Sequence, residues 1–135
     1  MSILAVIDTN VFVSSLLTSK ADAATVLIVK KMLAGEVVPV YSRVIMAEYR
    51  SVLARPKFKF NPEETSHLLA AIEMFGVLVE PDDSAISLLD EKDIPFYAAA
   101  LVTRASGSFL VTGNIRHFPS EPFVVTPRAF IDLFG

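Results

Sequence analysis

The sequence predicts an α/β protein, a three-layer α/β/α sandwich in which helices cover both faces of a mostly parallel central sheet. Apolar strand patterns alternate with helical patterns along the chain, which is the order that builds parallel sheets. The first strand, residues 3–7, is a continuous run of Ile, Leu, Ala and Val, typical of a strand buried on both faces. At 135 residues, the chain is expected to form a single domain over 1–135.

Composition limits the classes of function. The 53% hydrophobic content is high and favours a buried sheet and a partner surface, yet the longest nearly apolar run, residues 23–29, is too short to cross a bilayer. The chain has no cysteine and its amino terminus does not resemble a secretion signal, so we expect a cytoplasmic protein with no membrane partner. With a net charge of -3, binding of nucleic acid would need a local basic patch or a metal ion.

Apolar periodicity and capping residues predict the remaining elements in order. Strands are expected at 37–41, 77–80, 108–112 and 123–125, and helices at 11–17, 23–34, 43–53, 62–75, 94–102 and 127–134, with a helical turn at 87–90. The helix at 23–34 is apolar around most of its circumference, which indicates either a core helix or a dimer contact. In residues 55–60, cations alternate with phenylalanines. This pattern fits either a surface for single-stranded nucleic acid or a loop whose aromatic rings plug the core.

Two acidic residues lie at unusual positions in this pattern of strands and helices. Asp8 comes directly after the first strand, at the sheet edge where ligands bind in α/β proteins, although it could instead cap the next helix. Glu48 lies on the same helix face as Ile45 and Tyr49. An inward glutamate needs a partner because burying an unpaired carboxylate is costly. That partner could be a catalytic site or an arginine on or beside the same helix.

Two further polar residues fall at comparable places. Asp93 begins the helix at 94–102, where it could be a cap, and Asn114 follows the strand at 108–112. In a parallel sheet, Asp8, Glu48, Asp93 and Asn114 can meet at one edge. Carboxylates gathered there would repel each other by several kcal/mol per pair, about 4 kcal/mol at 4 Å near a protein surface, and a divalent cation relieves that repulsion. Oxygen ligands without cysteine suit Mg²⁺ or Mn²⁺ and metal-activated hydrolysis of a phosphodiester.

These motifs together resemble one known family over essentially the whole chain. Residues 7–10 read Ile-Asp-Thr-Asn, residues 93–97 read Asp-Ile-Pro-Phe-Tyr, and residues 110–114 read Leu-Val-Thr-Gly-Asn, with Glu48 between them. This order resembles PIN domains, in particular the VapC-like toxins of bacterial and archaeal toxin-antitoxin systems. The resemblance implies a Mg²⁺- or Mn²⁺-dependent endoribonuclease, usually a homodimer held inactive by a small antitoxin.

The resemblance also assigns roles to residues. By position, Asp8, Glu48 and Asp93 match the family's metal-binding acids, and Asn114 completes the predicted catalytic set where many PIN domains have an aspartate. An amide still offers an oxygen ligand, but the site loses one negative charge. We expect the orienting residues to be Thr9, Asn10 and Thr112, and the residues that contact RNA phosphate to be Arg116 and His117.

Two rival functions remain open at the level of sequence. The first is phosphoryl transfer through an aspartate, as in haloacid-dehalogenase-like phosphatases, but those enzymes need a second aspartate at the position of Asn10. The second is a PIN-fold binding module that has lost catalysis and acts through an antitoxin or another protein. Its only support is the amide at Asn114.

Overall fold

The sheet has the predicted parallel architecture. The computed structural model describes residues 2–135. Five strands are joined in the order β3-β2-β1-β4-β5, and every pair is parallel. Their bounds are Ile3–Ile7 for β1, Val37–Tyr41 for β2, Val77–Leu78 for β3, Phe109–Val111 for β4 and Val124–Val125 for β5. The apolar β1 therefore lies at the centre of the sheet, as its composition predicts.

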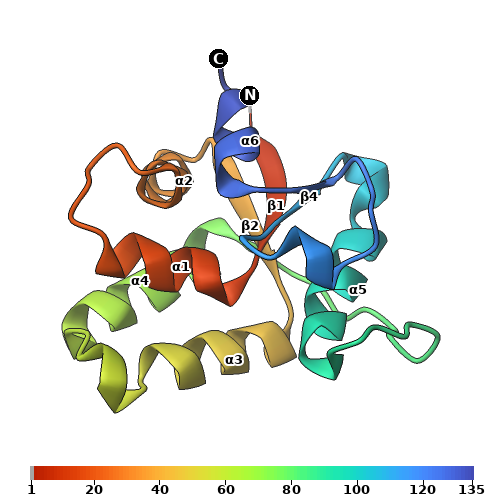
Figure 1. The fold of residues 1–135 in the computed structure, drawn as a ribbon, viewed down its shortest axis with the longest axis horizontal. Coiled ribbons are helices and arrows are strands. Elements are labelled where there is room, and N and C mark those ends of the chain that lie inside the picture. Colours follow the sequence, from red (N-terminus) through yellow and green to blue (C-terminus); the bar gives the residue numbers. More distant parts are fainter. Residues whose placement is uncertain (1) are drawn as a thin grey trace.

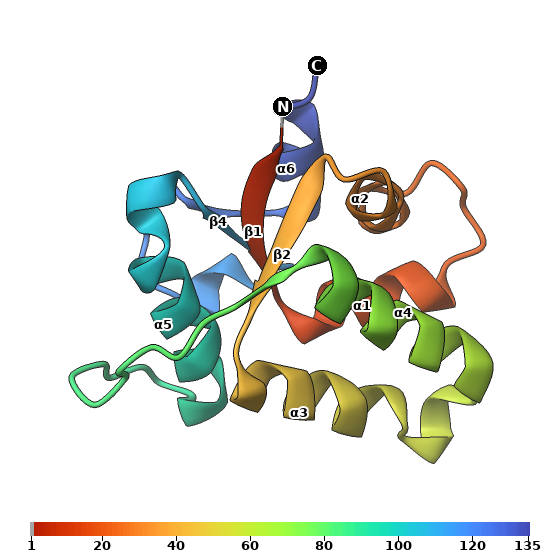
Figure 2. The ribbon, with the colours of Figure 1, turned by 180° about the vertical axis from the view of Figure 1, so that it is seen from behind.

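Helices cover both faces of this sheet, which confirms the predicted α/β/α fold. Their bounds are Thr9–Leu17 for α1, Ala24–Leu33 for α2, Arg43–Leu53 for α3, Pro62–Phe75 for α4, Ile94–Val102 for α5 and Pro127–Asp132 for α6. Figures 1 and 2 show α5 on one side of the strands and α1, α2 and α4 on the other. α3 runs along the lower end of the molecule in Figure 1, beside the point where β1 and β2 end.

Three helices begin where side-chain caps predict. The side chain of Ser42 accepts a hydrogen bond from the backbone N–H of Ile45 at the start of α3. Asn61 does the same for Glu63 at the start of α4, and Thr126 caps α6. These bonds satisfy backbone donors that the first turn of a helix leaves free, so the sequence fixes these helix starts locally.

The structure of two connecting segments decides between the alternatives that the sequence left open. The helical turn expected at 87–90 is wrong, because a short 3₁₀ helix, η2, forms instead at Glu91–Asp93, where the side chain of Asp90 accepts from the N–H of Lys92. In the segment 55–60, Phe58 and Phe60 stack at 5.1 Å and pack against the core. Their lysine neighbours are exposed, and Pro56–Phe58 forms a short 3₁₀ helix, η1. The segment is therefore a connection whose aromatic side chains pack against the core.

The core lies between the sheet and the helices, and α2 contributes only part of its surface to it. Tyr49, Phe12, Phe96 and Phe130 are among the largest fully buried side chains. On α2, only Ile28 and Met32 are buried, while Leu33 is 53% exposed. α2 therefore leaves apolar surface uncovered. Within residues 2–135, no helix is long and apolar enough to cross a membrane.

Candidate metal-dependent active site

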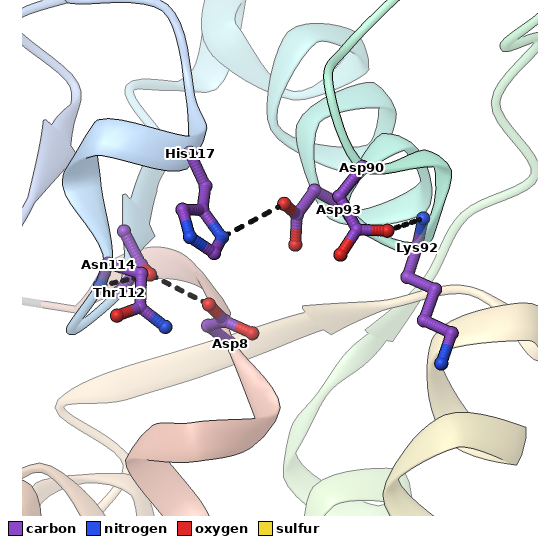
Figure 3. Close-up of polar contacts among 7 residues, drawn as sticks. All are labelled: Asp8, Asp90, Lys92, Asp93, Thr112, Asn114 and His117. Carbon is purple, nitrogen blue, oxygen red and sulfur yellow. Dashed lines mark hydrogen bonds and ion pairs between the residues drawn. The ribbon is translucent and has the colours of Figure 1, made fainter.

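Strand register brings Asp8 and Thr112 together. Ile7 of β1 pairs with Val111 of β4, so the residues that follow them emerge side by side at the carboxyl edge of the sheet. The hydroxyl of Thr112 donates to Oδ2 of Asp8 at 2.7 Å, and the backbone N–H of Asp8 donates to the carbonyl of Val111 at 2.9 Å. Asp8 is only 6% exposed. Figure 3 shows this carboxylate beside Thr112 and Asn114.

Neither Asp8 nor Asp93 caps the helix that it precedes. Asp8 occupies the cap position of α1 and Asp93 that of α5, yet neither side chain makes a capping hydrogen bond. Aspartate at such a position commonly accepts from the second or third N–H of the helix. The capping role considered for each acid from sequence is therefore wrong, and both carboxylates face other partners.

Glu48 lies on the inward side of α3, as its spacing predicts. Its side chain is half-buried, and its Oε2 accepts a hydrogen bond from the hydroxyl of Thr9. The arginines on the same helix pair elsewhere: Arg43 lies 3.3 Å from Glu80, and Arg50 lies 3.3 Å from Glu73. Across residues 2–135, no ion pair involves Glu48, so the salt-bridge explanation for its inward position fails.

Asp93 faces His117 across the site. The side chain of Asp93 is 13% exposed, and its Oδ2 lies 3.3 Å from Nδ1 of His117. This separation allows charge attraction to a protonated imidazole, but the contact lacks the direction of a hydrogen bond, and Oδ2 is buried with no hydrogen-bond partner in residues 2–135. Figure 3 shows the side chains of Asp8, Asp93 and His117 pointing toward one another. A buried carboxylate oxygen with free lone pairs is available to a cation there.

Burial and mutual repulsion affect the protonation of both aspartates. Burial raises the pKa of Asp8, and the nearby Asp93 raises it further, while the hydrogen bond from Thr112 opposes the rise. Burial likewise raises the pKa of Asp93, Asp90 adds to that rise, and His117 opposes it. The two carboxylates are therefore close enough to interact electrostatically, and a cation between them would stabilise both ionised forms.

The structure provides the donor atoms expected of a metal site, but the acidic side chains are not as close together as such a site requires. Among residues 2–135, no group of three or more acidic or histidine side chains is close enough to hold a metal ion. Like charges repel, and Asp8, Glu48 and Asp93 each rest against a different partner. The donors available are carboxylate and amide oxygens, and the unpartnered Oδ2 of Asp93 is one of them. This donor set fits a hard cation such as Mg²⁺ or Mn²⁺.

The other predicted site residues lie at different depths. Asn114 is half-buried, and its backbone N–H donates to the hydroxyl of Thr112 at 2.9 Å. Asn10 and Arg116 are exposed. No hydrogen bond links Asn10 to an acid in the described part of the chain, so its orienting role, like the phosphate contact of Arg116, stays a prediction.

One contact beside the site was not anticipated. The hydroxyl of Tyr49 donates to the carbonyl of Ile7, immediately before Asp8, and Tyr49 is 1% exposed. Burial raises the pKa of this phenol well above its usual value, and the charges of Asp8 and Glu48 raise it further. The inward spacing of Tyr49 was visible in the sequence. Its partner was not, because a backbone carbonyl leaves no residue signal.

Comparison with known families agrees with this geometry. A family model described as PIN domain matches residues 4–116. The chain belongs to the PIN domain family. No curated protein sequence matches it. PIN domains are generally nucleases and generally use divalent metals, and the matched region contains Asp8, Glu48, Asp93 and Asn114, while His117 lies one residue beyond it. The acids at the sheet edge therefore belong to a nuclease fold.

Proposed function

We propose that this PIN domain protein is a metal-dependent endoribonuclease that hydrolyses RNA phosphodiester bonds. The observation that supports the proposal is the pair Asp8 and Asp93, two largely buried carboxylates that begin helices without capping them and point toward each other. Burying a carboxylate is unfavourable unless a partner compensates. A divalent cation would compensate both acids and would in turn attract the anionic phosphodiester.

The chain's own residues would hold the cation and keep the acids oriented. Asp8, Glu48 and Asp93 supply carboxylate oxygens, and Asn114 can add its amide oxygen. A bound Mg²⁺ or Mn²⁺ supplies the positive charge that attracts a phosphodiester and promotes attack by water. Thr112 fixes the carboxylate of Asp8 through a hydrogen bond of 2.7 Å, and the hydroxyl of Thr9 fixes Glu48. Such outer contacts typically set ligand orientation in metal sites.

We also propose that the protein is the toxin of a type II toxin-antitoxin pair, of the VapC-like kind, and that it forms a homodimer bound by an antitoxin. The support is the resemblance of its motifs to those toxins together with uncovered apolar surface. A groove of about 330 Å³ lies between α1, α2 and α4, with a mainly apolar lining that includes Leu16, Val29 and Leu33. Light scattering on the purified protein at several concentrations would test the dimer, and co-expression with any small protein encoded next to it would test the antitoxin.

An RNA cleavage assay with matched variants tests the enzymatic proposal. The wild-type protein should cleave RNA from a broad panel of sequences in Mg²⁺ or Mn²⁺ and lose activity in EDTA. Asp8→Asn should lose the activity because it removes a charged ligand without changing side-chain size. Asp22→Asn, the same change at an exposed aspartate, should cleave like the wild type.

The same assay separates the nuclease from a binding module. Equal inertness of wild type and Asp8→Asn across the panel, together with no thermal shift in either metal, would replace the nuclease with a PIN-fold module that acts through a protein partner. Formation of an acyl-phosphate on Asp8 would instead indicate phosphoryl transfer through an aspartate.

A further inference from the structure

Each of the three acids rests against one polar side chain from a different element. Asp8 accepts from Thr112, Glu48 accepts from Thr9, and Asp93 faces His117. In the first two pairs the partner's hydroxyl fixes the carboxylate. We propose that His117 plays the corresponding part for Asp93, as a positioning residue that holds this carboxylate opposite Asp8 for the binding of a divalent cation. This inference rests on the proposed metal-dependent function.

Hydrogen bonds connect Asp8 to the backbone of His117 through the segment after β4, and the imidazole of His117 then faces Asp93. The backbone N–H of His117 donates to the carbonyl of Asn114 at 3.0 Å, and the N–H of Asn114 donates to the hydroxyl of Thr112 at 2.9 Å. That hydroxyl donates in turn to Asp8. The side chain of His117 then lies 3.3 Å from Asp93. The segment from Thr112 to His117 therefore links the surroundings of the two acids, and Figure 3 shows its labelled side chains between Asp8 and Asp93.

Asp93 has no other polar side chain to hold it in the described part of the chain. Its own helix start offers no capping bond, and its neighbour Asp90 repels it while binding the N–H of Lys92. Without His117, the carboxylate could turn among its rotamers, and ordering it on cation binding would cost side-chain entropy. The imidazole reduces that cost by keeping one rotamer and partly compensating the charge.

The geometry identifies which ring nitrogen matters. Nδ1 of His117 faces Asp93, and this nitrogen overlaps the side-chain amide nitrogen of an asparagine, whereas Nε2 overlaps that of a glutamine. His117→Asn therefore keeps a hydrogen-bond donor toward Asp93. His117→Gln keeps a donor only at the position of Nε2, which does not face Asp93. The ring is 53% exposed, so these substitutions should leave the fold intact.

Calorimetric titration with Mn²⁺ alone, without RNA, tests the proposal. His117→Ala should weaken Mn²⁺ binding by about 10-fold to 100-fold, the usual effect of removing an outer partner of a metal ligand. His117→Asn should recover most of the affinity, and His117→Gln should remain close to the alanine variant. In an Asp93→Asn background, His117→Ala should have no further effect, because the partner is gone. His67→Asn, at the chain's only other histidine, should bind like wild type.

Three results would overturn the positioning role: His117→Ala binding Mn²⁺ as tightly as wild type or more tightly, His117→Gln recovering affinity as well as His117→Asn, or the alanine effect persisting without Asp93. A wild-type protein that binds no Mn²⁺ would overturn it together with the metal site. If Mn²⁺ binding follows the expected pattern but no RNA is cleaved, the nuclease proposal fails and the role of His117 stands.

Discussion

The hydroxyl of Thr112 donates to the carboxylate of Asp8 at 2.7 Å and so joins two residues 104 positions apart in the chain. Thr112 is fully buried, and Asp8 is 6% exposed. The bond exists because β1 and β4 are neighbours in parallel register, with Ile7 opposite Val111. The geometry of the site therefore depends on the pairing of the central strand β1 with its neighbour β4, and a change at Thr112 should affect both stability and function.

Thr112→Val should destabilise the protein by about 1 to 3 kcal/mol, because it leaves the buried Asp8 carboxylate and the N–H of Asn114 without their partner. Valine has nearly the same shape as threonine, so the loss reports on the hydrogen bonds. Urea denaturation at neutral pH measures the free energy of unfolding. Thr112→Ser keeps the hydroxyl and should lose less stability. A larger loss in Thr112→Ser than in Thr112→Val would show that packing of the methyl group dominates.

Asp8→Asn should stabilise the metal-free protein at neutral pH while it removes activity. Burial raises the pKa of Asp8 above its ordinary value of 3.8, so the folded state binds this proton more tightly than the unfolded state. The contribution that this raised pKa makes to the stability of the folded state is fully present below pH 3.8, and it is lost as the pH rises through the pKa of Asp8 in the folded protein. Asparagine is never charged and avoids the loss. In EDTA at pH 7 we expect an increase of about 3 to 5 °C in unfolding temperature, equivalent to about 1 kcal/mol.

The pH dependence provides the control for this prediction. The stability difference between Asp8→Asn and wild type should shrink toward pH 3, where the wild-type carboxyl is protonated in both states. Asp22→Asn changes an exposed residue and should leave the unfolding temperature within about 1 °C of wild type. A metal-free Asp8→Asn protein less stable than wild type at pH 7 would contradict the inferred cost of the buried charge.

The sequence predicted the fold because its signals are local. An apolar run such as residues 3–7 indicates a buried strand wherever it lies, and caps such as Ser42 and Asn61 determine helix starts within three residues. The inward position of Glu48 followed from spacing alone. Each of these predictions depends on a few residues that are neighbours in the chain. The parallel sheet then brings the predicted elements together in the expected order.

The partners of the acids could not be predicted in the same way. That Thr9 would hold Glu48, or that Nδ1 of His117 would face Asp93, depends on distances between elements that no local pattern encodes. The resemblance gives Thr9 an orienting role and His117 a contact with RNA phosphate, but it names no partner acid for either residue. The spacing of the carboxylates is likewise a tertiary property, set by mutual repulsion and by the partner that each acid meets.

Asn114→Asp should make the protein less stable without metal and more responsive to metal. A fourth carboxylate on the residue two positions after Thr112 adds negative charge beside Asp8, which raises the repulsion in the metal-free site. A divalent cation relieves that repulsion and gains a charged ligand. Thermal unfolding in EDTA and in Mn²⁺ should show a lower first value and a larger difference between the two than wild type. An unchanged difference would place residue 114 outside the proposed metal site.

Gly76→Ala should strongly destabilise the fold from a position outside the site. Gly76 ends α4, and a Cβ atom added there would lie 2.5 Å from the carbonyl oxygen of Pro39 on β2 and would also clash with the carbonyl oxygen of Ile72. Both obstacles are backbone atoms, which cannot move aside as a flexible side chain can. We expect a loss of about 2 to 4 kcal/mol by urea denaturation, within the range of severe packing errors.

A matched change distinguishes steric conflict from a general cost of replacing glycine. At Gly113, in the segment that follows β4, an added Cβ meets nothing within 4 Å, and the residue does not have the positive φ of Gly35 or Gly107. Gly113→Ala should therefore change the free energy of unfolding by less than about 1 kcal/mol. Because Gly76 contacts β2 and not the acids, Gly76→Ala should lower metal binding only in proportion to the fraction of unfolded protein. A Gly76→Ala protein as stable as Gly113→Ala would show that α4 and β2 can separate at this contact without cost.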